Sequence, residues 1–328
     1  MSFLLEVRDL KTQFFTRRGV VRAVDGISFT VETGQTVGIV GESGCGKSVT
    51  ALSIMGLIRL PGRTVGGEIL YDYQGEVIDI LKLDPQGKQM RSIRGNEIAM
   101  IFQEPMTSMN PLFTIGTQIM ESIILHQHLN KHRAREKAIE MLQKVGIPLP
   151  GQRVDEYPHQ LSGGMLQRAM IGMALSCHPS LLIADEPTTA LDVTIQAQVL
   201  DLITNLRDEF KTSIILITHD LGIVAGLADE VIVMYLGRAV EKSNVYDVFY
   251  DARHPYTQGL MDSVPSITET RKKLRFIDGV VPNLLDVPLG CGFEPRCSKA
   301  VDRCKTRAPE LKEVTPKHWV ACWLYEEG

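Results

Sequence analysis

Residues 41–48 have the sequence GESGCGKS, which fits the pattern G-x-x-x-x-G-K-[ST]. The apolar run VGIV (37–40) precedes this stretch, and the helical pattern SVTALSIMGLI (48–58) follows it. In a strand–loop–helix context this pattern binds phosphate, because the loop amides and the helix N-terminus face the anion. Lys47 then reaches the β- and γ-phosphates, and the Ser48 hydroxyl binds Mg²⁺. An accidental glycine-rich turn is the weaker interpretation.

A second motif, LLIADEP (181–187), places two carboxylates after an apolar strand pattern. Asp185 and Glu186 then stand at the carboxyl end of the strand, where α/β sheets bind ligands. One carboxylate suits Mg²⁺, and the other can polarise an attacking water. Alone this motif is weak, but with the phosphate loop it predicts a nucleoside triphosphatase.

A third motif, LSGGMLQR (161–168), has a Ser–Gly–Gly turn that opens a helix. Such a turn forms another group of amides that binds an anion. One nucleotide does not need two such groups from the same subunit. We therefore expect this turn to meet the γ-phosphate of a nucleotide held by a second subunit. Taken alone, Ser162 would be interpreted as a plain helix N-cap.

Six motifs, GESGCGKS, FQEP, LSGGM, LLIADEP, TALD and ITHD, occur in this order over about residues 3–245. This set resembles the ATP-binding subunit of ABC transporters. The resemblance implies an α/β P-loop ATPase with a parallel core sheet, an antiparallel β subdomain and a helical subdomain. It also implies a head-to-tail dimer with two ATP molecules between the phosphate loops and the signature sequences.

The resemblance implies which positions bind ATP and Mg²⁺. The ATP-binding positions would be Phe14, Gly41, Glu42, Ser43, Gly44, Cys45, Gly46, Lys47, Ser48 and Val49. Ser48, Gln103 and Asp185 would bind Mg²⁺. The adenine-stacking aromatic is expected in a loop longer than the minimal form, where Phe14 and Phe15 both occur. Strand alternation turns only one of the pair outward, and Phe14 is preferred.

Further positions would act in catalysis or on the partner's nucleotide. Glu186 would be the general base, His219 the switch histidine that contacts the γ-phosphate, and Gln103 the glutamine that reports to the membrane subunits. The signature that closes on the partner's ATP would comprise Ser162, Gly163, Gly164 and Gln167. Asp192 would lie in the D-loop. Because Glu186 is a glutamate, we expect a catalytically competent subunit.

The stretches EIAMIFQEPMTSMNPLFTIGTQIMESI (97–123) and HPYTQGLMDSVPS (254–266) resemble the dipeptide/oligopeptide class of importer ATPases. The class also includes nickel importers, so a nickel or other small-solute cargo stays open. The resemblance implies a heterodimer with a second, homologous ATPase subunit beneath two transmembrane permease subunits, and a peptide-binding protein outside the cell membrane. A groove beside Gln103 would receive the permease's coupling helices.

Composition limits the partners and the cell location that we expect for this chain. With 35 Lys/Arg and 39 Asp/Glu among 328 residues the formal net charge is −4, so we expect no nucleic-acid partner. Acids at Glu6 and Asp9 argue against a secretory signal, and no run approaches the ~20 apolar residues that span a bilayer. We expect a peripheral protein on the cytoplasmic face of the cell membrane. A soluble, non-transport ABC ATPase is the less favoured alternative.

Periodicity divides the chain into an ATPase domain (1–250) and a C-terminal extension (251–328), with a helical subdomain at about 106–176. Helical spacing occurs at 115–129, 131–147, 163–177 and 194–210. Apolar strand patterns at 180–187, 212–220 and 229–237 alternate with helices, which predicts a parallel sheet. A hairpin is expected at 67–83, with YQGE as its turn.

Four of the six cysteines lie near the C-terminus, at Cys291, Cys297, Cys304 and Cys322. Zinc sites usually contain C-x₂₋₄-C pairs, which are missing here, and disulfides are rare in a reducing compartment. A four-thiolate iron–sulfur cluster tolerates varied spacing, and the family resemblance adds weight to it. We therefore predict a [4Fe–4S] cluster, with zinc as the alternative and with free thiols or disulfides less favoured.

Overall fold

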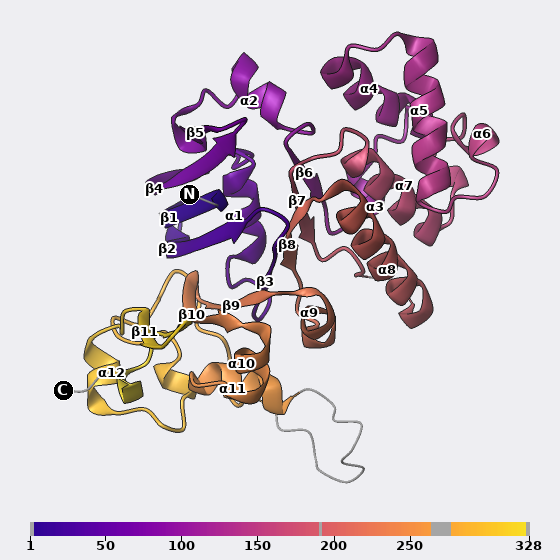
Figure 1. Cartoon of the computed structure of the whole chain (residues 1–328). Helices are drawn as coiled ribbons and strands as arrows, with labels where there is room; N and C mark the ends of the chain where they lie inside the picture. Colours follow the sequence, from indigo (N-terminus) through magenta and orange to yellow (C-terminus); the bar gives the residue numbers. More distant parts are fainter. Residues whose placement is uncertain (1–2, 190–191, 264–276, 326–328) are drawn as a thin grey trace.

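The computed structural model describes residues 3–189, 192–263 and 277–325 (Figure 1). Its main sheet has the strand order β11-β12-β10-β9-β3-β8-β7-β6. The parallel strands of this sheet are β3 (Thr36–Val40), β6 (Ile98–Ile101), β7 (Leu181–Asp185), β8 (Ser213–Ile217) and β9 (Glu230–Tyr235). Every residue of β3, β6, β7 and β8 is buried, as expected for parallel strands covered on both faces. The predicted parallel sheet is confirmed.

A smaller antiparallel sheet has the order β2-β1-β4-β5. Its strands are β1 (Phe3–Thr16), β2 (Gly19–Glu32), β4 (Gly62–Tyr73) and β5 (Glu76–Asp79), followed by η1 (Ile80–Lys82) and α2 (Lys88–Ile93). The β4–β5 pair is the hairpin expected at 67–83. Helix α1 (Lys47–Ile54) packs between this sheet and the main sheet in one apolar core. It ends four residues earlier than predicted, before Gly56, whose φ of 60° is not helical.

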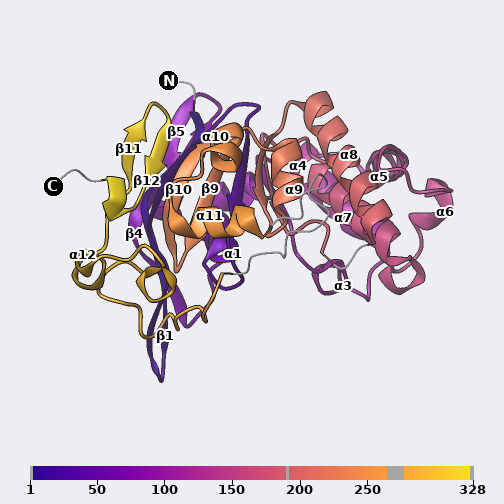
Figure 2. The ribbon, with the colours of Figure 1, turned by 90° about the horizontal axis from the view of Figure 1, so that it is seen from below.

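A helical group lies on the opposite side of the main sheet from the antiparallel sheet, as Figures 1 and 2 both show. It contains α3 (Pro105–Ser108), α4 (Ile115–Gln127), α5 (Lys131–Lys144), α6 (Pro150–Arg153), η2 (Pro158–Gln160) and α7 (Gly163–Leu175). The predicted helices at 115–129, 131–147 and 163–177 are confirmed as α4, α5 and α7. Thr114 and Asn130 cap the first turns of α4 and α5 through their side chains. No helix in the described ranges is long and apolar enough to cross a membrane.

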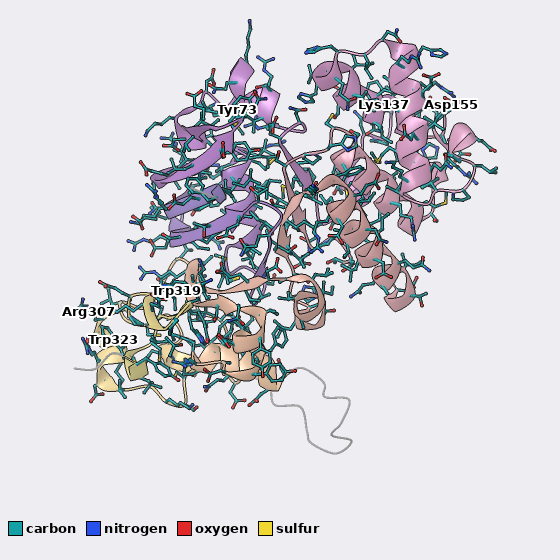
Figure 3. All side chains as sticks on the ribbon, viewed as in Figure 1. Tyr73, Lys137, Asp155, Arg307, Trp319 and Trp323 are labelled. Atoms are coloured by element: carbon teal, nitrogen blue, oxygen red, sulfur yellow. The ribbon has the colours of Figure 1, made fainter. Side chains whose placement is uncertain are left out.

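Helix α8 (Val193–Phe210) connects β7 to β8, and helix α9 (Leu221–Leu227) connects β8 to β9. The chain then forms β10 (Arg238–Asn244), α10 (Val245–Tyr250), α11 (Pro255–Asp262), η3 (Glu294–Arg296), α12 (Asp302–Thr306), β11 (Lys312–Thr315), β12 (His318–Val320) and η4 (Trp323–Tyr325). Strand β12 pairs antiparallel with β10, so the last hairpin continues the main sheet. Figure 3 shows Trp319 and Trp323 in this C-terminal part, far from Lys137 and Asp155 of the helical group.

Candidate functional site

The glycine-rich loop follows β3 directly and turns into α1. Gly46 has a φ of 104°, and a Cβ atom there would overlap the carbonyl oxygen of Ala23. A Cβ atom at Gly41 would likewise overlap the carbonyl oxygen of Met234. The loop therefore lies tightly against the neighbouring backbone, which only glycine permits at these two positions.

The Lys47 side chain lies over the loop that precedes it. Its Nζ donates to the carbonyl oxygens of Gly41 at 2.7 Å and Glu42 at 3.1 Å. Lys47 is almost fully buried, with 6% of its surface exposed. An ammonium group is thus held beside the loop that the sequence predicts to bind phosphate.

The Ser48 hydroxyl donates to Asp185 Oδ1 at 3.0 Å, although the two residues are 137 positions apart. Burial at the end of β7 raises the pKa of Asp185, and the hydrogen bond from Ser48 opposes that effect. A hydroxyl and a carboxylate are the hard oxygen donors that Mg²⁺ prefers. The pair fits the Mg²⁺ that the sequence predicts at Ser48 and Asp185.

Glu186 follows Asp185, and its carboxylate has three partners: Thr189 of the same loop, and Gln103 and His219 of two other segments. Gln103 Nε2 donates to Oε2 at 3.0 Å, the Thr189 hydroxyl donates to the same oxygen at 2.8 Å, and His219 Nδ1 lies 3.2 Å from Oε1. Burial opposes ionisation of Glu186. The hydrogen bonds from Thr189 and His219 and the nearby positive charge outweigh burial and lower its pKa. Glu186 is held ionised, as a base requires.

Sequence reasoning missed Thr189. The hydroxyl of this residue fixes one oxygen of Glu186 from the loop after β7. A hydroxyl three positions after a candidate base, in the segment DEPTT, was the available signal. The structure thus brings together Gln103, Glu186 and His219 as predicted neighbours and adds Thr189 to them.

The Ser–Gly–Gly turn opens α7. Ser162 caps the helix by accepting from the Met165 amide at 3.3 Å, and both Ser162 and Gly163 are exposed. Gln167 differs from its predicted neighbours, because it is 1% exposed and donates to the Pro187 carbonyl oxygen of its own chain. Its amide therefore ties α7 to the loop after Glu186 and does not face outward.

Asp192 caps α8 by accepting from the Ile195 amide at 3.0 Å. The two preceding residues of the TALD motif, 190 and 191, lie outside the described residues. The last three residues of the HPYT stretch, 264–266, lie outside them as well.

Phe14 and Phe15 are neighbours on β1, opposite Val21 and Val20 of β2. Phe14 is half-buried and lies so close to Gly62 that any Cβ there would meet its ring. Phe15 is 47% exposed, so the two rings do differ in exposure. The adenine-stacking role of Phe14 stays a prediction.

The predicted [4Fe–4S] cluster is wrong. Within the described residues, which include all four C-terminal cysteines, no group of three or more His, Cys, Asp or Glu side chains is arranged to hold a metal ion. The zinc alternative fails on the same observation, and the four cysteines are free thiols. Burial raises the pKa of Cys291 to about 11 and raises that of Cys297 and Cys322. Burial thus favours the protonated thiol over the thiolate that a metal requires.

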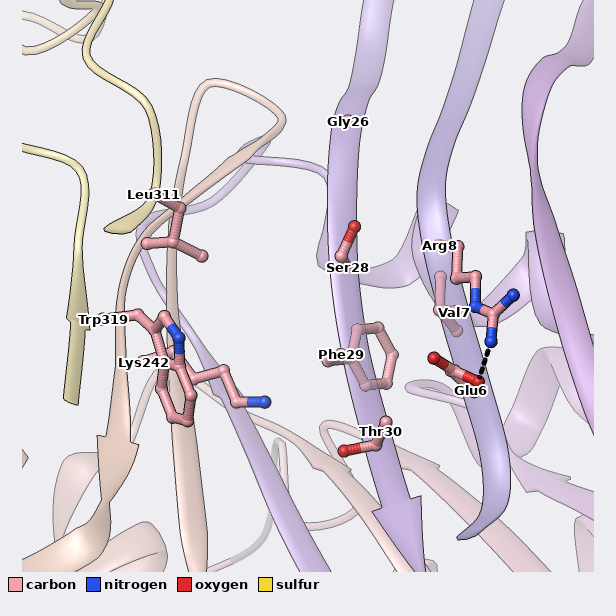
Figure 4. Close-up of a pocket in the computed structure, with 10 residues that line it drawn as sticks. All are labelled: Glu6, Val7, Arg8, Gly26, Ser28, Phe29, Thr30, Lys242, Leu311 and Trp319. Carbon is pink, nitrogen blue, oxygen red and sulfur yellow. Dashed lines mark hydrogen bonds and ion pairs between the residues drawn. The ribbon is translucent and has the colours of Figure 1, made fainter. Parts of the chain in front are cut away.

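A separate pocket of about 400 Å³ lies between the antiparallel sheet and the last strands (Figure 4). Lys242 Nζ lies 4.9 Å from the centre of the Trp319 ring on one wall. Glu6 and Arg8 form an ion pair of 2.7 Å on the other wall. The pocket is lined by none of the residues that the sequence predicts to bind ATP, so it is distinct from the candidate site.

Comparison with known families gives two matches along the chain. Residues 24–189 match the family model described as "ABC transporter". Residues 240–304 match the model described as "Oligopeptide/dipeptide transporter, C-terminal region". The two matches follow one another in the order that the motifs predict.

Curated relatives are similar over nearly their whole length. The oligopeptide transport ATP-binding protein AppD of Bacillus subtilis is 52% identical, over 100% of this chain and 98% of its own. The dipeptide transport ATP-binding protein DppD of Escherichia coli is 50% identical, over 97% of this chain and 96% of its own.

Solved structures share the fold. The ATP-binding cassette MJ0796, in a dimeric post-hydrolysis state bound to ADP and Pi, superposes with a TM-score of 0.65 at 24% identity, over 74% of this chain and 98% of that one. The cbiO1 protein of Clostridium perfringens, part of the ABC transporter complex cbiONQ, gives a TM-score of 0.61 at 26% identity, over 77% and 93%. The predicted ATPase cassette fold is confirmed.

Proposed function

This chain belongs to the ABC transporter family of ATP-binding proteins, and on that premise we propose that it is the ATP-hydrolysing motor of an importer for dipeptides or oligopeptides. The relatives named for oligopeptide and dipeptide transport, at 52% and 50% identity, support the cargo class. The observation that carries the enzymatic part is the Glu186 carboxylate, held by Gln103, Thr189 and His219 beside the Ser48–Asp185 pair.

The family implies ATP and Mg²⁺ as ligands. Ser48, Asp185 and Gln103 would hold the metal ion, which supplies charge stabilisation on the phosphate oxygens when bound. Lys47 would bind the β- and γ-phosphates, and the amides of the loop would surround them. The remaining predicted positions of the loop, Glu42, Ser43, Gly44, Cys45 and Val49, would line the same nucleotide, and Phe14 would stack on its adenine.

Glu186 would act as the base that orients the attacking water. Its lowered pKa favours the ionised form, and its three partners fix the position of the carboxylate. His219, whose side chain is 64% exposed, would be free on its other face to contact the γ-phosphate.

A second, homologous ATPase subunit would complete each site. The turn of Ser162, Gly163 and Gly164, whose first two residues are exposed, would close on the nucleotide of the partner, with Asp192 at the contact. ATP would then join the two subunits and hydrolysis would let them part, which makes the dimer a two-state element biased by its ligand. The two chains of such a dimer are proposed to differ, as a heterodimer.

Two transmembrane permease subunits and a peptide-binding protein outside the membrane would complete the importer. The chain would sit as a peripheral subunit on the cytoplasmic face of the cell membrane. Its helical subdomain, about 106–176, would receive the permease beside Gln103. The division into an ATPase domain and a C-terminal extension near residue 250 is part of the same proposal.

The test is reconstitution of the chain with its permease, its partner ATPase and the binding protein in liposomes. ATP hydrolysis is measured with the binding protein empty, loaded with a dipeptide or oligopeptide, and loaded with nickel. We expect stimulation by the peptide-loaded protein. Stimulation by nickel alone would replace the peptide with a metal cargo. An ATP hydrolysis rate that no loaded binding protein changes would contradict the importer proposal and favour a non-transport ATPase.

A further inference from the structure

The second residue of the phosphate loop, Glu42, is held by two side chains from the C-terminal part of the chain. Arg296 Nη1 donates to Glu42 Oε2 at 2.7 Å, and Nη2 donates to Oε1 at 3.0 Å. The Glu42 amide donates to the Tyr256 hydroxyl at 2.9 Å. Both contacts span more than two hundred positions of sequence.

These two side chains are themselves fixed. The Arg296 side chain is 3% exposed and also donates to the carbonyl oxygens of Asp278 and Ile277. Tyr256 is fully buried, and its ring packs on those of Tyr235 and Phe293 at centroid distances of 4.6 and 5.4 Å. A buried bidentate arginine and a packed tyrosine hold their polar atoms in one place, so they can hold the loop residue in place.

The same loop residue also contacts Lys47, the lysine predicted to bind the β- and γ-phosphates. The Glu42 carbonyl oxygen accepts from Lys47 Nζ at 3.1 Å. Glu42 therefore has its amide, carbonyl and carboxylate engaged at once. Two of these three contacts come from the C-terminal part, beyond the ATPase motifs.

We propose that Arg296 and Tyr256 are positioning residues for ATP binding: Arg296 neutralises the Glu42 carboxylate, and Tyr256 orients the Glu42 amide. This inference rests on the proposed binding of ATP at the loop. The Glu42 side chain is 29% exposed, so without Arg296 a free negative charge stands in the loop that receives a triphosphate. Like charges repel strongly where water is partly excluded.

Removal of the guanidinium should therefore weaken nucleotide binding through Glu42. We expect Arg296→Gln to raise the Kd for MgATP on the order of 10-fold, because the partner charge is left unpaired. In the double variant Arg296→Gln/Glu42→Gln no such charge remains, so most of the affinity should return. If the Arg296–Glu42 contact only held the loop in shape, the double variant would bind ATP as weakly as Arg296→Gln, since it also lacks the contact.

The test uses the full-length chain and a fluorescent ATP analogue, titrated with Mg²⁺ at low and high salt. The variants are Arg296→Gln, Glu42→Gln, the double variant, Arg296→Lys and Tyr256→Phe. Lys299→Gln is the matched control, because Lys299 lies three residues further on and contacts Gln258, not the loop. We expect Arg296→Gln to bind weakly with a loss that shrinks in salt, Arg296→Lys and the double variant to bind better, and Lys299→Gln to bind as wild type.

Equal affinity of Arg296→Gln and wild type would overturn the inference, and so would a double variant as weak as Arg296→Gln. If Arg296→Gln does not fold, Tyr256→Phe decides, because it removes one oxygen and keeps the ring; wild-type affinity in that variant would count against the proposal. Failure of the proposed function gives a different result, in which the wild-type chain itself binds no ATP.

Discussion

At the residue scale, the candidate site depends on a few side chains, most of which come from distant segments. Gln103, Thr189 and His219 surround Glu186, and Ser48 contacts Asp185. The motifs named five of these six residues, because each motif has a known chemical role. Thr189 escaped prediction because a threonine in a loop has no single expected role.

The first prediction concerns Glu186→Gln. An amide keeps the shape of the side chain but cannot accept a proton, so we expect hydrolysis to fall by about 10²–10⁴-fold. ATP binding should remain near wild type, because Lys47 and the loop are untouched. Phosphate release and analogue binding, measured on one preparation, check both parts. Retained turnover would remove Glu186 as the base.

The second prediction concerns pH and the same residue. The usual pKa of a glutamate, 4.5, is lowered in the folded protein because hydrogen bonds outweigh burial. A group with a lowered folded pKa stabilises the native state above its unfolded pKa, and that contribution is lost as pH falls through the folded pKa. The stability advantage of wild type over Glu186→Gln should therefore be larger at about pH 7 than at about pH 4. Urea unfolding at both pH values measures it, and an advantage that grows in acid would contradict it.

At the scale of elements, local signals placed the helices and strands well. Helix α4 begins after Thr114 and α5 after Asn130, where capping side chains satisfy the first free amides. Helix α1 stops before Gly56, which the helical pattern did not anticipate. The residue at which a helix ends depends on the backbone angles of one or two residues, and hydrophobic periodicity gives no information about those angles.

The third prediction belongs to the turn between β3 and α1. Gly46→Ala combines a positive φ with an overlap against the Ala23 carbonyl oxygen. We expect a loss of stability above the about 1–3 kcal/mol of backbone strain alone, and a loss of nucleotide binding. Gly34→Ala is the matched control, since Gly34 has a φ of 78° with open space around it. Denaturant unfolding compares the two, and equal costs would show that the overlap is relieved.

At the scale of the whole molecule, the C-terminal part joins the ATPase sheet through a buried acid. Glu241 of β10 is fully buried, lies 2.7 Å from His318 of β12, and accepts from the amides of Arg253 and His254. This carboxylate fixes the last hairpin to the sheet. Such a contact is not visible in the sequence, because 77 residues separate its two side chains.

The fourth prediction tests this connection. Glu241→Ala removes the carboxylate partner of the buried His254 amide, the buried His318 ring and the half-buried Arg253 amide, so we expect a loss of about 3–5 kcal/mol in the free energy of unfolding. Glu310→Ala is the control, because its ion pair with Arg307 is exposed and 3.9 Å long and should contribute below about 1 kcal/mol. Urea unfolding of both variants measures the difference. Equal effects would contradict a structural role for Glu241.

The sequence by itself determined the cassette fold, and it predicted the phosphate loop and Glu186 as the base, because these depend on local patterns with one physical meaning. The local sequence is enough to recognise glycines at positions where a side chain would clash, acids after a buried strand, and capped amphipathic helices. Only the tertiary structure shows what the C-terminal part contacts. The cysteine spacing allowed a metal cluster, but among the described residues no group of three or more His, Cys, Asp or Glu side chains is arranged to hold a metal ion. Arg296, which lies between Cys291 and Cys297, instead reaches Glu42 across 254 positions, a contact that depends on packing.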